Sequence, residues 1–282
     1  VESAFKAIVS LCSLAAKGEI MASLKNHHSS SIVKILYLGD SGTGKTGSLV
    51  SLVQAGYKLR ILDLDNGLDI LKAFIEKDCP DKIDLVDFET RRDKMKGGAM
   101  GPVVDGTPKA LVDSMKLMTK WSDDSVPAEW GPDTVFVCDS LTGIGKAAFE
   151  WAKAMSPLAK EPRQWYHTAQ QAVDNFISLV TSESFKTNVI MIAHIHFQEG
   201  PDGTLKGYAN TIGKALGPIV PTYFNNMVLA RSSGSGDKVK RTISTVPTAM
   251  IDLKNTAPFR VDQTLPLETG LATLFNQLKG VK

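Results

Sequence analysis

The chain contains 282 residues, of which 43% are hydrophobic, and this is enough to build the core of one large α/β domain. Its 32 basic and 30 acidic residues give a formal net charge of +2, so the overall charge does not require a polyanionic partner. The three cysteines, Cys12, Cys79 and Cys138, are scattered and lack the spacing of a metal site, which predicts a reducing, cytoplasmic location.

Residues 1–30 are predicted to be an N-terminal extension ahead of a main domain over 31–282. The apolar run at 7–16 is too short to span a bilayer, so we expect no membrane association. The stretch "KGEIM" at 17–21 fits purine-rich codons like those of a ribosome-binding site, which suggests that residues 1–20 come from an upstream reading frame and that Met21 is the natural start. The alternative is a short amphipathic helix.

The first half of the main domain alternates between apolar strands and helices. A strand at 32–39 is followed by a glycine-rich turn and a helix from residue 45, and a second unit has a strand at 59–65 and a helix at 67–77. A further strand is expected at 83–88 and a helix at 107–121. The polar, glycine-rich residues 89–106 between them predict a surface loop.

The second half continues this pattern and then changes. We expect a buried strand at 134–140, a helical zone at 141–182 broken near Pro157 and Pro162, a strand at 188–195 and a glycine-rich loop at 198–217. One face of the helical zone carries Trp165, Ala169, Ala172, Phe176 and Leu179. Short antiparallel strands follow, with a turn at 233–237. The whole pattern predicts an α/β fold, with a mainly parallel sheet flanked by helices and antiparallel strands at its C-terminal end.

The turn after the first strand matches the P-loop pattern G-x-x-x-x-G-K-[ST]. Backbone N–H groups in such a loop surround phosphates, and the N-terminus of the following helix adds positive potential. We expect Lys45 to bind the terminal phosphates and the Thr46 hydroxyl to ligate Mg²⁺. No guanine-reading N-K-x-D motif is present, so the expected cofactors are ATP and Mg²⁺. The predicted phosphate-binding residues are Gly39, Asp40, Ser41, Gly42, Thr43, Gly44, Lys45, Thr46 and Gly47.

Acidic residues follow two of the predicted strands. Asp139 comes at the end of an apolar strand and is the expected second Mg²⁺ ligand, acting through water. The next residue is Ser140 rather than glutamate, so the group that activates water must come from elsewhere. The strand at 59–65 offers Asp63, Asp65 and Asp69 near the edge of the sheet where ligands bind in such folds.

These motifs together resemble those of RecA-like ATPases. The stretch "DLDNGLD" at 63–69 is similar in spacing to the D-A-E-H-A-L-D stretch of bacterial recombinases, and it places Asp65 on their catalytic glutamate. "VCDSLTG" at 137–143 and "VIMIAHI" at 189–195 extend the likeness, and His194 falls on the polar residue that senses the γ-phosphate. The likeness spans about 33–275 and is strongest to short phage RecA-like proteins linked to single-strand annealing.

The resemblance implies a RecA-like P-loop NTPase core with an Mg²⁺-dependent ATPase activity, in which Lys45, Asp65 and His194 are the catalytic residues. Asp65 is one methylene shorter than the family's glutamate, and a base must come within about 3 Å of its water, so slow hydrolysis or a shifted backbone is expected. Two plainer interpretations stay open. Asp65 could be a solvated helix N-cap, and His194 could end a buried strand with a backbone partner, with His196 pointing the same way.

The resemblance also implies a route for single-stranded DNA along the loop at 198–217. Lys206, Tyr208 and Lys214 are the candidate DNA-binding residues, because cations and an aromatic ring among glycines suit phosphates and a stacked base. The alternative is a solvent loop, since it also carries Glu199 and Asp202. We interpret the basic cluster of Arg91, Arg92, Lys94 and Lys96 as a solvated face, and the aromatic stretch at 163–171 as helix packing.

RecA-like subunits complete a neighbour's site with a cation, so the resemblance implies a homo-oligomer, either a ring or a filament. Arg241 and Lys254 are the candidates for this cation. The leading hypothesis is an ATP-dependent protein of phage recombination that binds single-stranded DNA and works with phage or host recombination proteins in the host bacterial cytoplasm. The alternatives are a nucleotide-binding structural or regulatory protein with little hydrolysis, and a helicase or packaging motor subunit.

Overall fold

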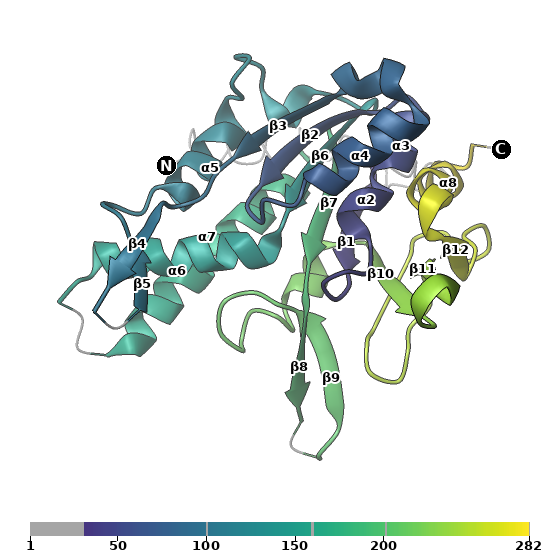
Figure 1. Ribbon diagram of the computed structural model, residues 1–282. Helices are drawn as coiled ribbons and strands as arrows, with labels where there is room; N and C mark the ends of the chain where they lie inside the picture. The colour runs from purple at the N-terminus through teal and green to yellow at the C-terminus, as the bar shows by residue number, and fades with distance from the viewer. Residues whose placement is uncertain (1–30, 100, 159–160, 201, 282) are drawn as a thin grey trace, which may run out of the picture. The chain divides into compact units, whose positions relative to one another are not determined.

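A computed structural model describes residues 31–99, 101–158, 161–200 and 202–281, so the predictions for residues 1–30 lie outside the described residues. An eight-stranded sheet organises the chain from residue 32 onward, in the order β12-β11-β10-β1-β7-β6-β2-β3 (Figure 1). The first six strands along the chain that belong to it are parallel: β1 (Lys34–Leu38), β2 (Lys58–Asp63), β3 (Val86–Thr90), β6 (Thr134–Asp139), β7 (Asn188–Ala193) and β10 (Asn226–Ser233). Strands β11 (Lys240–Ser244) and β12 (Thr264–Pro266) are antiparallel, which confirms the predicted α/β fold.

Helices cover both faces of the sheet, and this explains why the central strands are apolar throughout. Every residue of β6 and β7 is buried, as expected for parallel strands covered on both sides. One face packs against α5 (Ala110–Thr119), α6 (Leu141–Met155) and α7 (Pro162–Thr181). The other face packs against α3 (Val50–Gln54), α4 (Asp69–Asp78) and α8 (Leu267–Lys279), while the short α2 (Lys45–Ser48) directly follows the P-loop.

The buried face of helix α7 agrees in part with the face predicted from the periodicity of the sequence. Ala169 and Phe176 are buried as expected, whereas Leu179 is 37% exposed. The other buried residues are Val173, Ile177 and Val180. Toward the C-terminal end of the helix, the buried face therefore lies one residue further along the chain than predicted. Trp165 packs against the core, and its Nε1 donates to the Ser156 carbonyl at 2.9 Å, which supports the interpretation of 163–171 as helix packing.

Two segments predicted as loops are β-hairpins. Residues 89–106 contain β4 (Met95–Gly98) and β5 (Gly101–Val104). The loop predicted at 198–217 contains β9 (Leu205–Ala209) and the end of β8 (Ile195–Glu199). Their glycines hid the alternation that indicates strands, because glycine has low strand propensity. The second hairpin turns through Gly203, whose φ is 76°, a value that favours glycine. The hairpin β8–β9 projects beyond the edge of the sheet (Figure 1).

Other boundaries also moved. The strand predicted at 83–88 starts three residues later, after the 3-10 helix η2 (Pro80–Leu85). Short antiparallel strands were expected toward the C-terminal end, and 249–256 was one of the segments concerned. It makes only a single bridge, between Lys254 and Met227, while β12 is the antiparallel strand at the edge of the sheet. Three further 3-10 turns are η3 (Pro127–Glu129), η4 (Val220–Tyr223) and η5 (Gly236–Lys238). In the described part of the chain, no helix has the length and apolar character needed to cross a membrane.

Candidate functional site

The P-loop connects β1 to α2 and folds closely around its own lysine. Lys45 Nζ donates to the carbonyl oxygens of Gly39 at 2.7 Å and of Asp40 at 2.8 Å. Burial lowers the pKa of Lys45 from its ordinary value, and the nearby carboxylates of Asp139, Asp40 and Asp65 oppose this effect. The ammonium group is therefore held at the loop by acceptors that a phosphate could replace.

Two glycines allow neighbouring helices to press against this loop. Gly44 has a φ of 91°, and a Cβ at this position would lie 2.5 Å from the Leu267 side chain of α8. A Cβ on Gly47 would lie 2.7 Å from the Phe74 ring of α4. The lack of a side chain is thus a packing requirement at both positions, and at Gly44 it is also a conformational one.

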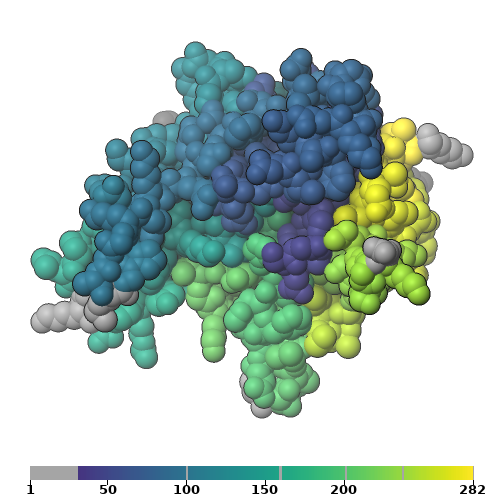
Figure 2. Space-filling model, viewed as in Figure 1, coloured from purple at the N-terminus to yellow at the C-terminus, as the bar shows by residue number. Residues whose placement is uncertain are grey.

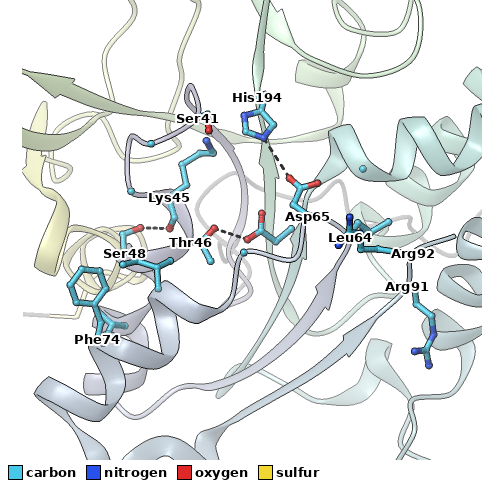
Figure 3. A pocket seen from close by; sticks show the side chains of 18 of the residues that line it. Ser41, Lys45, Thr46, Ser48, Leu64, Asp65, Phe74, Arg91, Arg92 and His194 are labelled. Atoms are coloured by element: carbon cyan, nitrogen blue, oxygen red, sulfur yellow. Dashed lines mark hydrogen bonds and ion pairs between the residues drawn. The ribbon is translucent and has the colours of Figure 1, made fainter. Parts of the chain in front are cut away.

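The two residues predicted to hold Mg²⁺ are in direct contact. Thr46 Oγ1 donates to Asp139 Oδ2 at 2.7 Å, and Asp139 is only 3% exposed (Figure 3). Burial raises the pKa of Asp139 to about 6, and Asp65 and Asp63 add to this, while the hydrogen bond from Thr46 and the charge of Lys45 act against it. A buried carboxylate beside a hydroxyl is an oxygen donor set that fits Mg²⁺, and a cation would relieve the cost of burying this charge.

Asp65 lies just beyond β2 and faces two donors. Ser140 Oγ donates to Asp65 Oδ2 at 2.7 Å, and His194 Nε2 lies 3.5 Å from the same oxygen (Figure 3). Partial burial raises the pKa of Asp65, but the hydrogen bonds from His194 and Ser140, together with the charges of His194 and Lys146, outweigh it, so the pKa lies below its ordinary value. Asp65 is therefore held as a carboxylate, the form that accepts a proton.

The other two acidic residues of the segment have different surroundings. Asp63 accepts hydrogen bonds from the Asn66 backbone N–H at 2.8 Å and from Thr90 Oγ1 at 3.2 Å, which makes it a structural residue of the turn. Asp69 is exposed and opens α4. The N-cap of α4 is Leu68.

The first turn of α6 reaches both Asp65 and the segment after the projecting hairpin. A Cβ on Gly143 would lie 2.6 Å from Leu64 and 3.1 Å from Asp65 Oδ1. A Cβ on Gly145 would lie 3.2 Å from the backbone of Thr211 and Ile212. These glycines let one helical turn touch both regions.

His194 stands between β7 and β8, at the base of the hairpin. Its backbone N–H donates to Thr142 Oγ1 at 3.3 Å, and its carbonyl accepts from the Asn210 N–H at 2.7 Å. The side chain faces Asp65, whereas His196 lies on β8 opposite Tyr208. The backbone of His194 is thus bonded to α6 and to the residue after β9, while its imidazole faces the candidate base Asp65.

A cavity of about 1160 Å³ unites these groups, and Lys45, Thr46, Asp65, Asp139 and His194 all line it. Three apolar side chains that the sequence analysis missed also line it: Ile70 and Phe74 from α4, and Leu267 from α8. Apolar walls beside a phosphate loop suit a nucleotide base. The sequence shows Ile70 and Phe74 only as two large apolar residues of a predicted helix. The structure reveals that the helix leaves them 48% and 36% exposed.

The two candidates for a cation supplied to a neighbouring subunit lie in different places. Arg241 lines the cavity, and its Cδ lies 3.2 Å from where a Cβ on Gly44 would be, so it stands beside the P-loop of its own chain. Lys254 bridges to Met227 through the backbone and lines a separate small pocket.

The candidate DNA-binding residues lie on or after the projecting hairpin. Lys206 forms an ion pair with Asp252 at 3.1 Å, Tyr208 is half-buried and Lys214 is exposed. The basic cluster at 91–96 does not form one free face. Arg91 pairs with Glu89 at 2.8 Å and Lys96 with Asp105 at 2.9 Å, whereas Arg92 lines the cavity.

Sheet order, P-loop and buried carboxylate together define a P-loop nucleotide-binding protein of RecA-like fold. The chain belongs to a family described as "AAA domain", whose model matches residues 31–257. A search of curated proteins gave no significant match. The three residues at the start of α8 that line the cavity, Leu267, Glu268 and Thr269, lie beyond the matched segment.

Solved structures with a similar chain path include three proteins. The RadB recombinase has 15% identity and a TM-score of 0.48, covering 84% of this chain and 89% of that chain. The flagellar accessory protein FlaH from Methanocaldococcus jannaschii has 11% identity and a TM-score of 0.40, covering 84% and 87%. The KaiC-like protein PH0186 from Pyrococcus horikoshii OT3 has 11% identity and a TM-score of 0.37, covering 78% and 80%.

Proposed function

We propose that the chain binds ATP with Mg²⁺ and hydrolyses it to ADP and phosphate. The observation that carries this proposal is the meeting of Lys45, the Thr46–Asp139 pair and the Asp65–His194 pair in one cavity. These are a phosphate cation, a set of metal-binding oxygens and a proton acceptor, which are the parts that phosphoryl transfer to water needs.

Each residue has a distinct role in the proposed reaction. The P-loop N–H groups and Lys45 bind the β- and γ-phosphates, and Lys45 exchanges its bonds to Gly39 and Asp40 for phosphate oxygens. Thr46 and Asp139 would hold Mg²⁺, which would supply positive charge to the phosphate oxygens. Asp65 takes a proton from the attacking water, while Ser140 orients its carboxylate. His194 reports the state of the γ-phosphate to the hairpin that follows it.

We further propose that the protein binds single-stranded DNA in phage recombination or annealing, as a homo-oligomer. The support is the position of the hairpin, which starts directly after His194 and carries Lys206 and Tyr208 on β9, with Lys214 following. Cations beside an aromatic ring suit a single strand. Arg241 or Lys254 completes the neighbour's site in this proposal.

The test measures phosphate release from ATP by the full chain, with Mg²⁺ or with EDTA, and with or without a single-stranded oligonucleotide. Lys45→Ala is the blank, and Lys116→Ala, which removes a 72% exposed lysine on α5, is the matched control. We expect Mg²⁺-dependent release in the wild type and the control, and higher release with the oligonucleotide. Equal release by wild type and Lys45→Ala would refute the enzyme proposal.

One observation favours a second function, a nucleotide-binding regulatory protein with little hydrolysis. Asp65 is a short carboxylate, and Ser140 and His194 both face the same oxygen of it. Asp65→Glu separates the two functions, because it brings the carboxylate closer to the water. A several-fold rise in phosphate release supports the ATPase, while tight ATP binding with no release in either form supports the regulatory function.

A further inference from the structure

The cavity continues past Asp65, away from the P-loop, into a region that we call the arm. Its volume of about 1160 Å³ exceeds the range of roughly 300–1,000 Å³ that is typical of sites for a single small ligand. Figure 3 shows Lys45 and Thr46 on one side of Asp65 and Arg91 and Arg92 on the other. The side chains that define the arm are Arg91, Arg92, Met95, Val104, Lys146 and Glu150.

Most charges near the arm already have partners. Arg91 pairs with Glu89 at 2.8 Å, and Glu150 pairs with Lys153 at 2.7 Å. Arg92 and Lys146 differ, because the described residues offer neither of them a hydrogen bond or an ion pair, although the charge of Lys146 acts on Asp65 from a distance.

One further charged residue, Asp93, lines this region, and its Oδ1 accepts hydrogen bonds from the backbone N–H groups of Lys109 and Ala110 at the start of α5. The other side chains of the arm are apolar. Met95 on β4 is 55% exposed, and Val104 on β5 lies beside it in the lining. A surface that fits the arm would therefore carry two negative charges, to pair with Arg92 and Lys146, next to apolar side chains.

The tip of the β8–β9 hairpin has these properties. Glu199 and Asp202 have no cationic partner within 4 Å among the described residues, and Phe197 and Leu205 are 37% and 46% exposed. Asp202 uses Oδ1 to accept from Thr204, which leaves its second oxygen free for an ion pair. The outer end of the hairpin projects from the molecule (Figures 1 and 2), while β9 contacts the segment at 250–252 through the Lys206–Asp252 ion pair and the hydrogen bond from the Gly207 N–H to the Met250 carbonyl. Two acids at the tip repel nucleic-acid phosphates, so the tip suits a basic protein surface better than DNA.

We propose that the hairpin tip of one copy docks into the arm of the next copy. The acids Glu199 and Asp202 then face Arg92 and Lys146, and the apolar residues of the tip cover Met95 and Val104. The two surfaces are different parts of the chain, so the contact is head-to-tail and builds a ring or a filament. This inference rests on the self-assembly part of the proposed function and names the surfaces that carry it.

Docking would place the hairpin between the Asp65 residue of its own copy and the Asp65 residue of the next copy. Within one chain the hairpin starts at the residue after His194, whose side chain faces Asp65. In the next chain the tip enters the cavity that also contains Asp65. In the docked arrangement, a change at one site therefore reaches the neighbouring site through the β8–β9 hairpin.

The experiment measures association of the full chain by sedimentation velocity, with Mg²⁺ and a non-hydrolysable ATP analogue. The tip variant combines Glu199→Arg and Asp202→Arg, and the arm variant combines Arg92→Glu and Lys146→Glu. Each is expected to weaken association at least about tenfold, because like charges then face each other. Asp84→Lys with Glu183→Lys, at two exposed acids outside both surfaces, is the charge-matched control and should associate like the wild type.

The decisive sample is a mixture of the two variants. The basic tip fits the acidic arm, and the acidic tip fits the basic arm, so the mixture should assemble although neither variant does so alone. Assembly of the tip variant at wild-type strength, or a mixture that stays monomeric, would overturn the proposal. Loss of oligonucleotide binding by the arm variant, with assembly unchanged in the tip variant, would also overturn it and would assign the arm to nucleic acid.

Binding of a fluorescent ATP analogue separates this inference from the proposed function. The tip variant should bind the analogue like the wild type, because none of its changed residues lines the cavity. A wild type that assembles without binding the analogue would refute the nucleotide proposal and leave the docking intact. A wild type that binds the analogue and hydrolyses ATP while monomeric would refute the docking alone.

Discussion

The two ends of the cavity are built differently. At the P-loop end, Lys45 and Thr46 each have partners within the chain, and α4 and α8 pack against the loop glycines. In the arm, Arg92 and Lys146 have no ion-pair partner among the described residues, and the hairpin β4–β5 is exposed along nearly its whole length. The difference teaches that the contacts of one end are made by folding alone, whereas the cations of the other remain available for the docking that we propose.

The largest expected effect is at the P-loop end. Lys45→Ala removes the cation that would face the transferred phosphate, so phosphate release should fall by a factor on the order of 10²–10³. The measurement is steady-state phosphate release with saturating Mg²⁺ and ATP, together with a thermal melt that shows the variant is folded. A folded variant with wild-type turnover would remove the functional distinction between the two ends.

The buried carboxylate of Asp139 gives a second test of the P-loop end. Its pKa of about 6 lies above its ordinary value of 3.8, so the folded chain favours the protonated form. The stabilisation is fully present below about pH 4 and is lost as the pH rises through about 6, by about 3 kcal/mol in the free energy of unfolding. Urea denaturation of the nucleotide-free chain from pH 4 to 7 measures this slope.

Asp139→Asn is the control for that slope, because it keeps the shape of the side chain and cannot titrate. The difference in the free energy of unfolding between wild type and variant should change with pH over this range. A constant difference would mean that Asp139 does not titrate as described. Saturating Mg²⁺ should reduce the slope in the wild type, since a cation stabilises the carboxylate.

Packing against the loop gives a smaller effect. Gly44→Ala places a methyl group 2.5 Å from Leu267 and strains a φ of 91°, so we expect a loss of about 1–3 kcal/mol in the free energy of unfolding. Gly42→Ala is the matched control, because its φ of 79° imposes a similar strain while no atom lies within 4 Å of the added methyl. Equal losses in both variants would show that the backbone, and not the contact with α8, accounts for the cost.

The smallest effect is expected in the arm. Arg92→Gln removes a charge that has no partner among the described residues, so the free energy of unfolding should change by less than about 0.5 kcal/mol. Urea denaturation of the monomeric chain at low protein concentration checks this. A loss larger than 1 kcal/mol would mean that folding organises the arm as it does the P-loop, and the contrast between the two ends would disappear.

The sequence predicted the parts whose signals are local. The P-loop pattern, the apolar parallel strands and the acid at the end of β6 each lie within a few consecutive residues, and the fold confirms their placement. The resemblance assigned Asp65 and His194 to one catalytic site, and the structure places their side chains 3.5 Å apart although 129 positions separate them along the chain. Parallel strands bring their C-terminal ends to one edge of the sheet. Residues that follow two such strands, here β2 and β7, therefore meet at one site.

The parts that were missed depend on packing between distant segments. Both hairpins were predicted as loops because glycines hide the alternation of strands: Gly97, Gly98 and Gly101 in β4–β5, and Gly200, Gly203 and Gly207 in β8–β9. Helix α8 contributes Leu267 to the cavity, yet its sequence carries no chemical motif and no sign that it would meet the P-loop. Contacts of this kind leave no trace in the local pattern of either segment.

The first turn of α6 has a mechanical consequence. Gly143 lies against Asp65, and Gly145 lies against the backbone at 211–212. The first turn of α6 therefore contacts both the candidate base and the segment after the hairpin. The buried Thr211 hydroxyl also has no hydrogen-bond partner among the described residues, so this segment has an unused bond to gain by moving. Because the backbone approaches closely at both glycines, we expect a shift of this segment toward α6 to displace the first turn of that helix and, with it, the side chain of Asp65.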